Sequence, residues 1–142
     1  MSKFNVHVNH IPILTEYQTG IAELFTEVFY LKPNHLFLWD STYYYVSHTD
    51  WGKVIKKVLL DMPRYTAQKF DCENFAMLTC ARTAEIFKLN TMGVAIGQSP
   101  MGYHGFNIFK SELGLFYLEP QTGMVYGVNE GSGYKAEIVI LG

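Results

Sequence analysis

The sequence has little charge, few cysteines and no long apolar run. Its 142 residues carry 11 Lys and Arg against 13 Asp and Glu, a formal net charge of -2. We therefore expect no basic surface for nucleic acid. Two cysteines cannot supply a disulfide framework, and no apolar run reaches the ~20 residues of a membrane span. The first ten residues contain no signal-peptide core, which favours synthesis in the cytoplasm.

Apolar and aromatic residues are abundant instead. Hydrophobic residues make up 49% of the chain and aromatic residues 15%, which favours one compact domain over residues 1–142. The composition changes near residue 90, because ten of the twelve glycines lie between Gly93 and Gly142. We expect helices before this point and short strands after it.

The first half contains three segments with helical periodicity. Apolar residues recur at helical spacing over 20–31, 50–61 and 72–89. Thr49 or Asp50 is the expected N-cap of the second helix, and Asp71 that of the third. The aromatic segment 35–46 fits either a strand or a loop.

The second half reads as a series of strands separated by Gly and Pro. Short apolar or alternating runs lie at hairpin spacing, over 93–97, 103–109, 115–118, 124–128 and 136–141. The order of elements predicts an α+β fold, in which N-terminal helices pack on a C-terminal antiparallel sheet.

Three residues could form a catalytic group in this fold. Cys72 would lie in the first turn of a helix, where the partial positive charge favours a thiolate. His104 and Glu119 would lie on neighbouring strands, so that Glu119 could orient the imidazole and His104 could act as general base. This pattern predicts a cysteine hydrolase, a peptidase or amidase that forms a thioester acyl-enzyme.

The local sequence around these residues resembles that of a known family. The segments DCENFA (71–76), YHGFNIF (103–109) and YLEPQTG (117–123) are similar to the papain-like and transglutaminase-like cysteine protease superfamily. They are closest to the C-terminal cysteine-protease domain of Marasmius oreades agglutinin and to related small phage and bacterial proteins. The resemblance covers roughly residues 60 to 128.

The resemblance implies a papain-like fold, with Cys72 as nucleophile, His104 as base and Glu119 as orienter. It also implies a side-chain donor to the oxyanion, for which Gln68 is the nearest upstream candidate, and Gln121 could hydrogen-bond near the site. Calcium is implied as well, and the oxygens available near Cys72 belong to Asp71, Glu73 and Asn74. The metal ligands stay unknown at this point. The expected partner is a peptide or a peptidoglycan-like substrate, with no nucleic acid and no membrane. A phage-encoded or virion-associated protein would fit.

Two alternatives stay open. A non-catalytic binding or structural protein on the same fold could keep the three residues as a polar network, and its Cys72 would not react with iodoacetamide at neutral pH. An acyl transferase would pass the acyl group to an added amine instead of to water.

Overall fold

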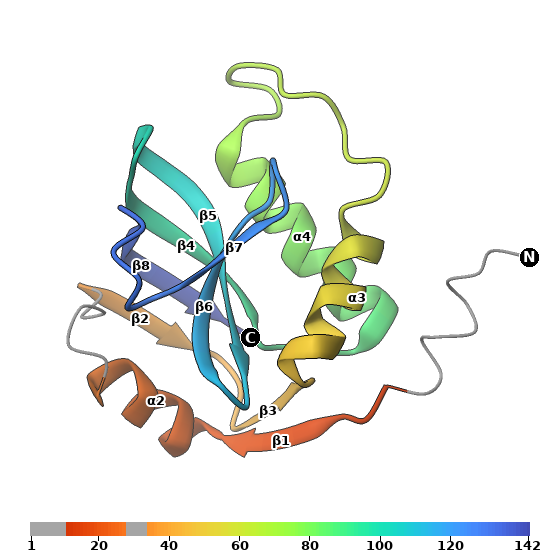
Figure 1. Ribbon diagram of the computed structural model, residues 1–142, viewed down its shortest axis with the longest axis vertical. Helices are drawn as coiled ribbons and strands as arrows, with labels where there is room; N and C mark the ends of the chain where they lie inside the picture. Colours follow the sequence, from red (N-terminus) through yellow and green to blue (C-terminus); the bar gives the residue numbers. More distant parts are fainter. Residues whose placement is uncertain (1–10, 28–33) are drawn as a thin grey trace, which may run out of the picture.

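Figure 1 shows the computed structural model of the chain, which describes residues 11–27 and 34–142. In this part of the chain the structure is mostly β-sheet with three helices. The elements in chain order are β1 (Leu14–Tyr17), α2 (Gln18–Glu27), β2 (His35–Leu38), β3 (Thr42–Tyr45), α3 (His48–Val58), α4 (Cys72–Phe87), β4 (Met92–Ser99), β5 (Gly102–Ser111), β6 (Gly114–Glu119), β7 (Met124–Gly127) and β8 (Lys135–Leu141).

The main sheet has six strands in the order β2-β8-β4-β5-β6-β7. Neighbouring strands are antiparallel except at one edge, where β2 runs parallel to β8 and His35 lies opposite Ile138. The strands β1 and β3 form a separate antiparallel pair. The main sheet is therefore mixed.

The expected arrangement of N-terminal helices on a purely antiparallel C-terminal sheet is wrong. The first half of the chain contributes three strands, because the aromatic segment 35–46 bends at Trp39–Ser41 and forms β2 and β3. The strand β2 covers one edge of β8, whose backbone would otherwise lie unpaired. Short-range periodicity does not show that a distant segment supplies this edge.

Several local predictions are confirmed. The five C-terminal strands form where the alternation places them, and α4 begins at Cys72 with Asp71 as its N-cap. The N-cap of α3 is Ser47, whose hydroxyl accepts the Asp50 N–H at 3.1 Å, and not Thr49 or Asp50. The helix expected over 20–31 is α2, and its positions 28–31 lie outside the described residues.

Two apolar clusters lie on opposite faces of the main sheet. On one face Ile21 and Phe25 of α2 pack with Phe106 of β5 and other sheet residues. On the other face the residues of α3, with Trp51 fully buried, pack with Phe109 of β5. The two faces hold α2 on one side of the sheet and α3 and α4 on the other (Figure 1).

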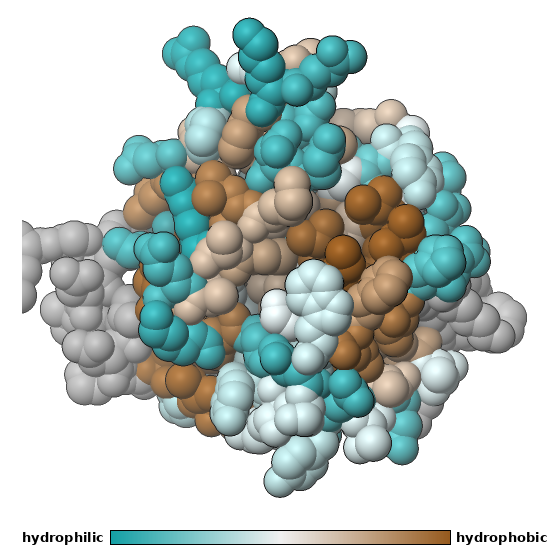
Figure 2. Space-filling model, turned by 180° about the vertical axis from the view of Figure 1, so that it is seen from behind, coloured by the Kyte–Doolittle hydropathy of each residue, from teal (hydrophilic) through white to brown (hydrophobic). Residues whose placement is uncertain are grey.

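The helix α4 covers only part of its face. Val94 and Ile96 of β4 lie opposite Ile140 and Ile138 of β8, and all four are half-buried. Phe37 of β2 continues the row and is 46% exposed. Figure 2 shows this side of the molecule, with apolar residues gathered beside α4 over β4, β8 and β2. None of the helices in the described ranges is long and apolar enough to cross a bilayer.

Candidate functional site

The start of α4 is fixed by local hydrogen bonds around Asp71. The Asp71 N–H donates to Oδ1 of Asn74 at 3.2 Å, and Oδ2 of Asp71 accepts the Gln68 N–H at 3.1 Å. These bonds join the preceding loop to the first helical turn. They place Cys72 at the amino end of α4, as the sequence predicts.

Gly105 brings this helix end against β5. A Cβ at Gly105 would lie 3.0 Å from both Cα and N of Glu73, so a larger residue would collide with helix backbone. The Gly105 N–H donates to Sγ of Cys72 at 3.3 Å. Because His104 precedes Gly105 in the same strand, the close approach places the thiol and the imidazole around one cleft.

His104 and Glu119 form a buried pair. Nε2 of His104 lies 2.5 Å from Oε1 of Glu119, and the two residues are 7% and 2% exposed. The carboxylate also accepts the Gln121 N–H at Oε2, at 3.3 Å, and the Tyr134 hydroxyl at Oε1, at 3.4 Å. The structure thus brings together the two strand residues that the sequence pairs.

The Cys72 thiol has a different partner. It donates to Oε2 of Glu73 at 3.2 Å, and no hydrogen bond joins it to His104 in the part of the chain that the structure describes. Burial raises the pKa of Cys72, the Gly105 N–H opposes this, and the Glu73 carboxylate raises the pKa further. The expected lowering of the Cys72 pKa is not found, because burial and the Glu73 carboxylate raise this pKa.

A cleft of about 350 Å³ opens beside these residues. It is lined by Cys72, Glu73, Ile96, Tyr103, His104 and Gly105. Gln68 is exposed and contacts the helix start through its backbone N–H, and Gln121 contacts Glu119 through its own backbone. Neither residue lines this cleft, so a role for the two side-chain amides there stays a prediction.

Several of the oxygens near Cys72 accept local hydrogen bonds. Oδ2 of Asp71 and Oδ1 of Asn74 each accept a backbone N–H, and Oε2 of Glu73 accepts the Cys72 thiol. Within residues 11–27 and 34–142, no group of three or more His, Cys, Asp or Glu could hold a metal ion. Oδ1 of Asp71 is buried and has no hydrogen-bond partner among the described residues, and a calcium ion beside it stays a prediction.

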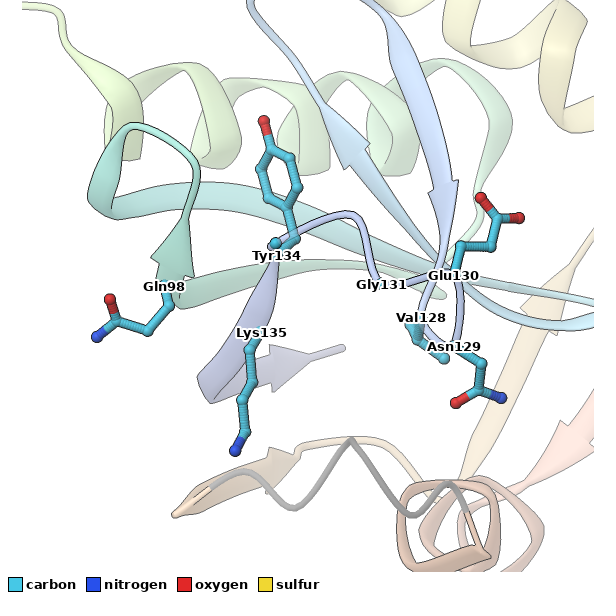
Figure 3. Close-up of a pocket in the computed structure, with 8 residues that line it drawn as sticks. Gln98, Val128, Asn129, Glu130, Gly131, Tyr134 and Lys135 are labelled. Atoms are coloured by element: carbon cyan, nitrogen blue, oxygen red, sulfur yellow. The ribbon is translucent and has the colours of Figure 1, made fainter.

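A second and larger depression, which we call the polar hollow, lies at the ends of β4 and β8. Its volume is about 640 Å³, and it is lined by Gln98, Val128, Asn129, Glu130, Gly131, Gly133, Tyr134 and Lys135. Figure 3 shows Lys135 and Asn129 extending to one side and the Tyr134 hydroxyl turned to the other. Gln98 and Lys135 are register partners across β4 and β8.

The polar hollow was not predicted from the sequence. Its residues come from the end of β4, the segment after β7 and the start of β8, and no local motif joins these stretches. The one signal was the pair of glycines Gly131 and Gly133, which have φ of 64° and 89°. Such backbone marks a special loop but does not identify a ligand site.

Solved structures share this fold, among them the following two. One is a complex of PSL1a with E64, with a TM-score of 0.73 and 21% identity over 89% of this chain and 51% of that chain. The other is Polyporus squamosus lectin bound to the human-type influenza-binding epitope Neu5Acα2-6Galβ1-4GlcNAc, with a TM-score of 0.69 and 21% identity over 89% and 49%. The chain spans about half the length of these chains. No protein-family model and no curated protein matches it.

These neighbours overturn the sequence-based assignment. The papain-like or transglutaminase-like protease family finds no support, since the matched structures are of a lectin. The expected cysteine hydrolase activity and the peptide or peptidoglycan-like substrate are contradicted with it. The resemblance rests on short segments around Cys72, His104 and Glu119, whereas the structural likeness extends over 89% of the chain. The site roles of these three residues stay predictions.

Proposed function

We propose that the chain is a non-catalytic domain that binds carbohydrate in the polar hollow. The single observation that carries this proposal is the hollow itself, an open depression of about 640 Å³ with amide, carboxylate and ammonium side chains at its border. The fold that the chain shares with lectin structures supports the choice of ligand class.

The side chains of the polar hollow suit a sugar. Sugar hydroxyls both donate and accept hydrogen bonds, and the amides of Gln98 and Asn129 do the same. Glu130 can accept two hydroxyl groups, and Lys135 can donate to ring or carboxylate oxygens. All four are exposed. Tyr134 adds an aromatic flank with a polar end, a surface that packs on C–H groups.

The state of the Cys72 thiol supports the non-catalytic part of the proposal. A thiol that donates to Glu73 and whose pKa is raised is a poor nucleophile at neutral pH. We further propose that residues 1–142 form one domain, since both apolar clusters share the main sheet. We also propose that the chain is made in the cytoplasm, a reducing compartment with which its two free thiols are compatible.

Titration of the ¹⁵N-labelled chain with Neu5Acα2-6Galβ1-4GlcNAc tests the binding. We expect saturable shifts of backbone amide signals in 128–135 and at Gln98, because these residues border the polar hollow. Shifts confined to other surfaces, or none at millimolar sugar, would contradict the proposal.

A matched pair of lysine variants tests the location. Lys135→Ala is expected to weaken binding of the trisaccharide about 3- to 10-fold, through loss of a charged donor. Lys53→Ala is the control, because Lys53 is on α3 and pairs with Asp50 at 3.2 Å. Equal effects of the two substitutions on the dissociation constant would place the sugar outside the polar hollow.

E64 supplies a contrasting probe. We expect the intact mass of the chain to stay unchanged after incubation with E64 at pH 7, because the raised pKa of Cys72 disfavours the reactive thiolate. An adduct that forms rapidly on wild type and is lost in both Cys72→Ser and His104→Ala would contradict a non-catalytic protein.

A further inference from the structure

Tyr134 links the polar hollow to the buried pair beside the Cys72 cleft. The residue lines the polar hollow, while its hydroxyl donates to Oε1 of Glu119 at 3.4 Å. The same carboxylate oxygen lies 2.5 Å from Nε2 of His104, and His104 lines the Cys72 cleft. A continuous chain of contacts therefore runs from the buried pair to the border of the hollow.

We infer that the buried His104–Glu119 pair positions Tyr134 and thereby determines how strongly the polar hollow holds its ligand. The inference rests on the proposed carbohydrate binding and adds a role for two residues that do not touch the sugar. In this role His104 and Glu119 are positioning residues, and Tyr134 is the residue through which they act.

The backbone around Tyr134 makes such an anchor necessary. Gly131 and Gly133 both have left-handed φ, of 64° and 89°, and glycine has more conformational freedom than any other residue. Backbone bonds of β8 begin only at the next residue, Lys135. Besides the bond from its backbone N–H to Oγ of Ser132, at 3.4 Å, Tyr134 is held by contacts of its side chain.

Those contacts act on two different parts of the side chain. The ring stacks on Tyr126, with centroids 5.1 Å apart and planes at 21°, and meets the edge of Phe106 at 5.1 Å. Ring packing of this kind restrains the plane of the Tyr134 ring but still allows the ring to shift within that plane. The hydroxyl contact with Glu119, at 3.4 Å, adds a directional restraint at the far end of the ring.

The acid-base properties of Tyr134 agree with this geometry. Burial and the nearby Glu119 carboxylate raise the pKa of Tyr134 to about 12, from an ordinary value of 10.0. The phenol thus stays protonated over the physiological range and remains a donor to Glu119. Glu119 is fully enclosed and has three donors around it, which keeps the acceptor in place.

Two single variants and their combination test the inference. Tyr134→Phe keeps the ring and removes the hydroxyl, and Glu119→Gln removes the charge of the acceptor. We expect each to weaken binding of Neu5Acα2-6Galβ1-4GlcNAc about 2- to 10-fold, the range for one lost hydrogen bond. The double variant should bind no more weakly than Tyr134→Phe, because Tyr134→Phe already removes the hydroxyl through which Glu119 acts.

The matched control is Tyr126→Phe, which keeps the stacked ring and leaves the bond between Tyr134 and Glu119 intact. Losses that add in the double variant, or an unchanged dissociation constant in Tyr134→Phe, would overturn the inference. Circular dichroism identifies any variant that has lost its fold. Of these variants, Tyr134→Phe is the one expected to disturb the packing least, because it removes only a hydroxyl group.

A ligand-free measurement separates this inference from the proposed function. In a chain labelled with ¹³Cζ-tyrosine, we expect Glu119→Gln to move the Tyr134 titration from about 12 toward the ordinary 10.0, since one of its causes is removed. An unmoved Tyr134 signal would overturn the positioning contact even if sugar binds. A moved signal in a chain that binds no sugar would leave the contact standing and refute the carbohydrate proposal.

Discussion

At the scale of single residues, Gly105 determines how closely the helix and the sheet approach at the Cys72 cleft. The first turn of α4 lies where a Cβ on Gly105 would be, 3.0 Å from two backbone atoms of Glu73. Neither backbone can move alone, because α4 is fixed by its cap and Gly105 is paired with Ile96 of β4. The Gly105 N–H is also a partner of the Cys72 sulfur.

We expect Gly105→Ala to lower the free energy of unfolding by about 1–3 kcal/mol, the usual cost of forcing an extra methyl into a packed site. Urea denaturation followed by circular dichroism measures this. Gly52→Ala is the matched control, because a Cβ at Gly52 in α3 meets nothing within 4 Å, and alanine favours a helix. A loss of stability at position 52 as large as at 105 would refute the steric explanation.

At the scale of elements, Arg82 holds the connection between α3 and α4. Its guanidinium donates to the carbonyl oxygen of Val58 at 2.9 Å and to that of Leu60 at 2.7 Å. These carbonyls lie at the end of α3, where helical partners are missing, and a cation there also meets the negative end of the helix dipole. Arg82 thereby fixes the start of the long loop that leads to Cys72.

Removing this side chain should loosen the loop. We expect Arg82→Ala to cost about 1.5–3 kcal/mol of unfolding free energy, the range for hydrogen bonds that involve a charged group. Faster hydrogen exchange over 59–71 is the accompanying signature. Arg64→Ala is the control, since Arg64 is exposed in the same loop. Unchanged exchange in Arg82→Ala would show that other contacts hold the loop.

The elements also indicate what a sequence can and cannot predict. The start of α4 and the five C-terminal strands follow from an Asp cap and from alternation, which are local signals. The position of β2 depends on which distant strand has a free edge. The N-cap of α3 depends on the hydroxyl of Ser47, two residues before Thr49 and three before Asp50. In both cases several local arrangements are nearly equal in free energy, and tertiary packing selects one of them.

At the scale of the whole molecule, Asn107 ties α4 to the main sheet. Its Nδ2 donates to the carbonyl oxygens of Ala76 in α4, at 3.0 Å, and of Gly93 in β4, at 2.9 Å. Asn107 is fully buried, so these bonds are costly to lose. Such cross-links explain why α4 presents Cys72 to β5 in one orientation.

The site was only partly predictable for the same reason. The proximity of His104 and Glu119 followed from the order of two neighbouring strands. The hydrogen-bond partner of Cys72 could not be predicted in this way, because its thiol bonds to the adjacent residue Glu73 and not to His104. Tyr134 reaches Glu119 from the start of β8, a contact set by the main sheet as a whole. Long-range contacts of this kind leave no signature in a single sequence.

The most direct test of a non-catalytic protein is the rate of Cys72 alkylation by iodoacetamide against pH, in a Cys80→Ser background. The thiolate is the reactive form, so the rate rises as pH passes the pKa of Cys72. Because that pKa is raised, we expect slow reaction at pH 7 and a midpoint above the ~8.5 of a free thiol, with His104→Ala unchanged. Fast reaction at neutral pH that His104→Ala abolishes would contradict the proposed function.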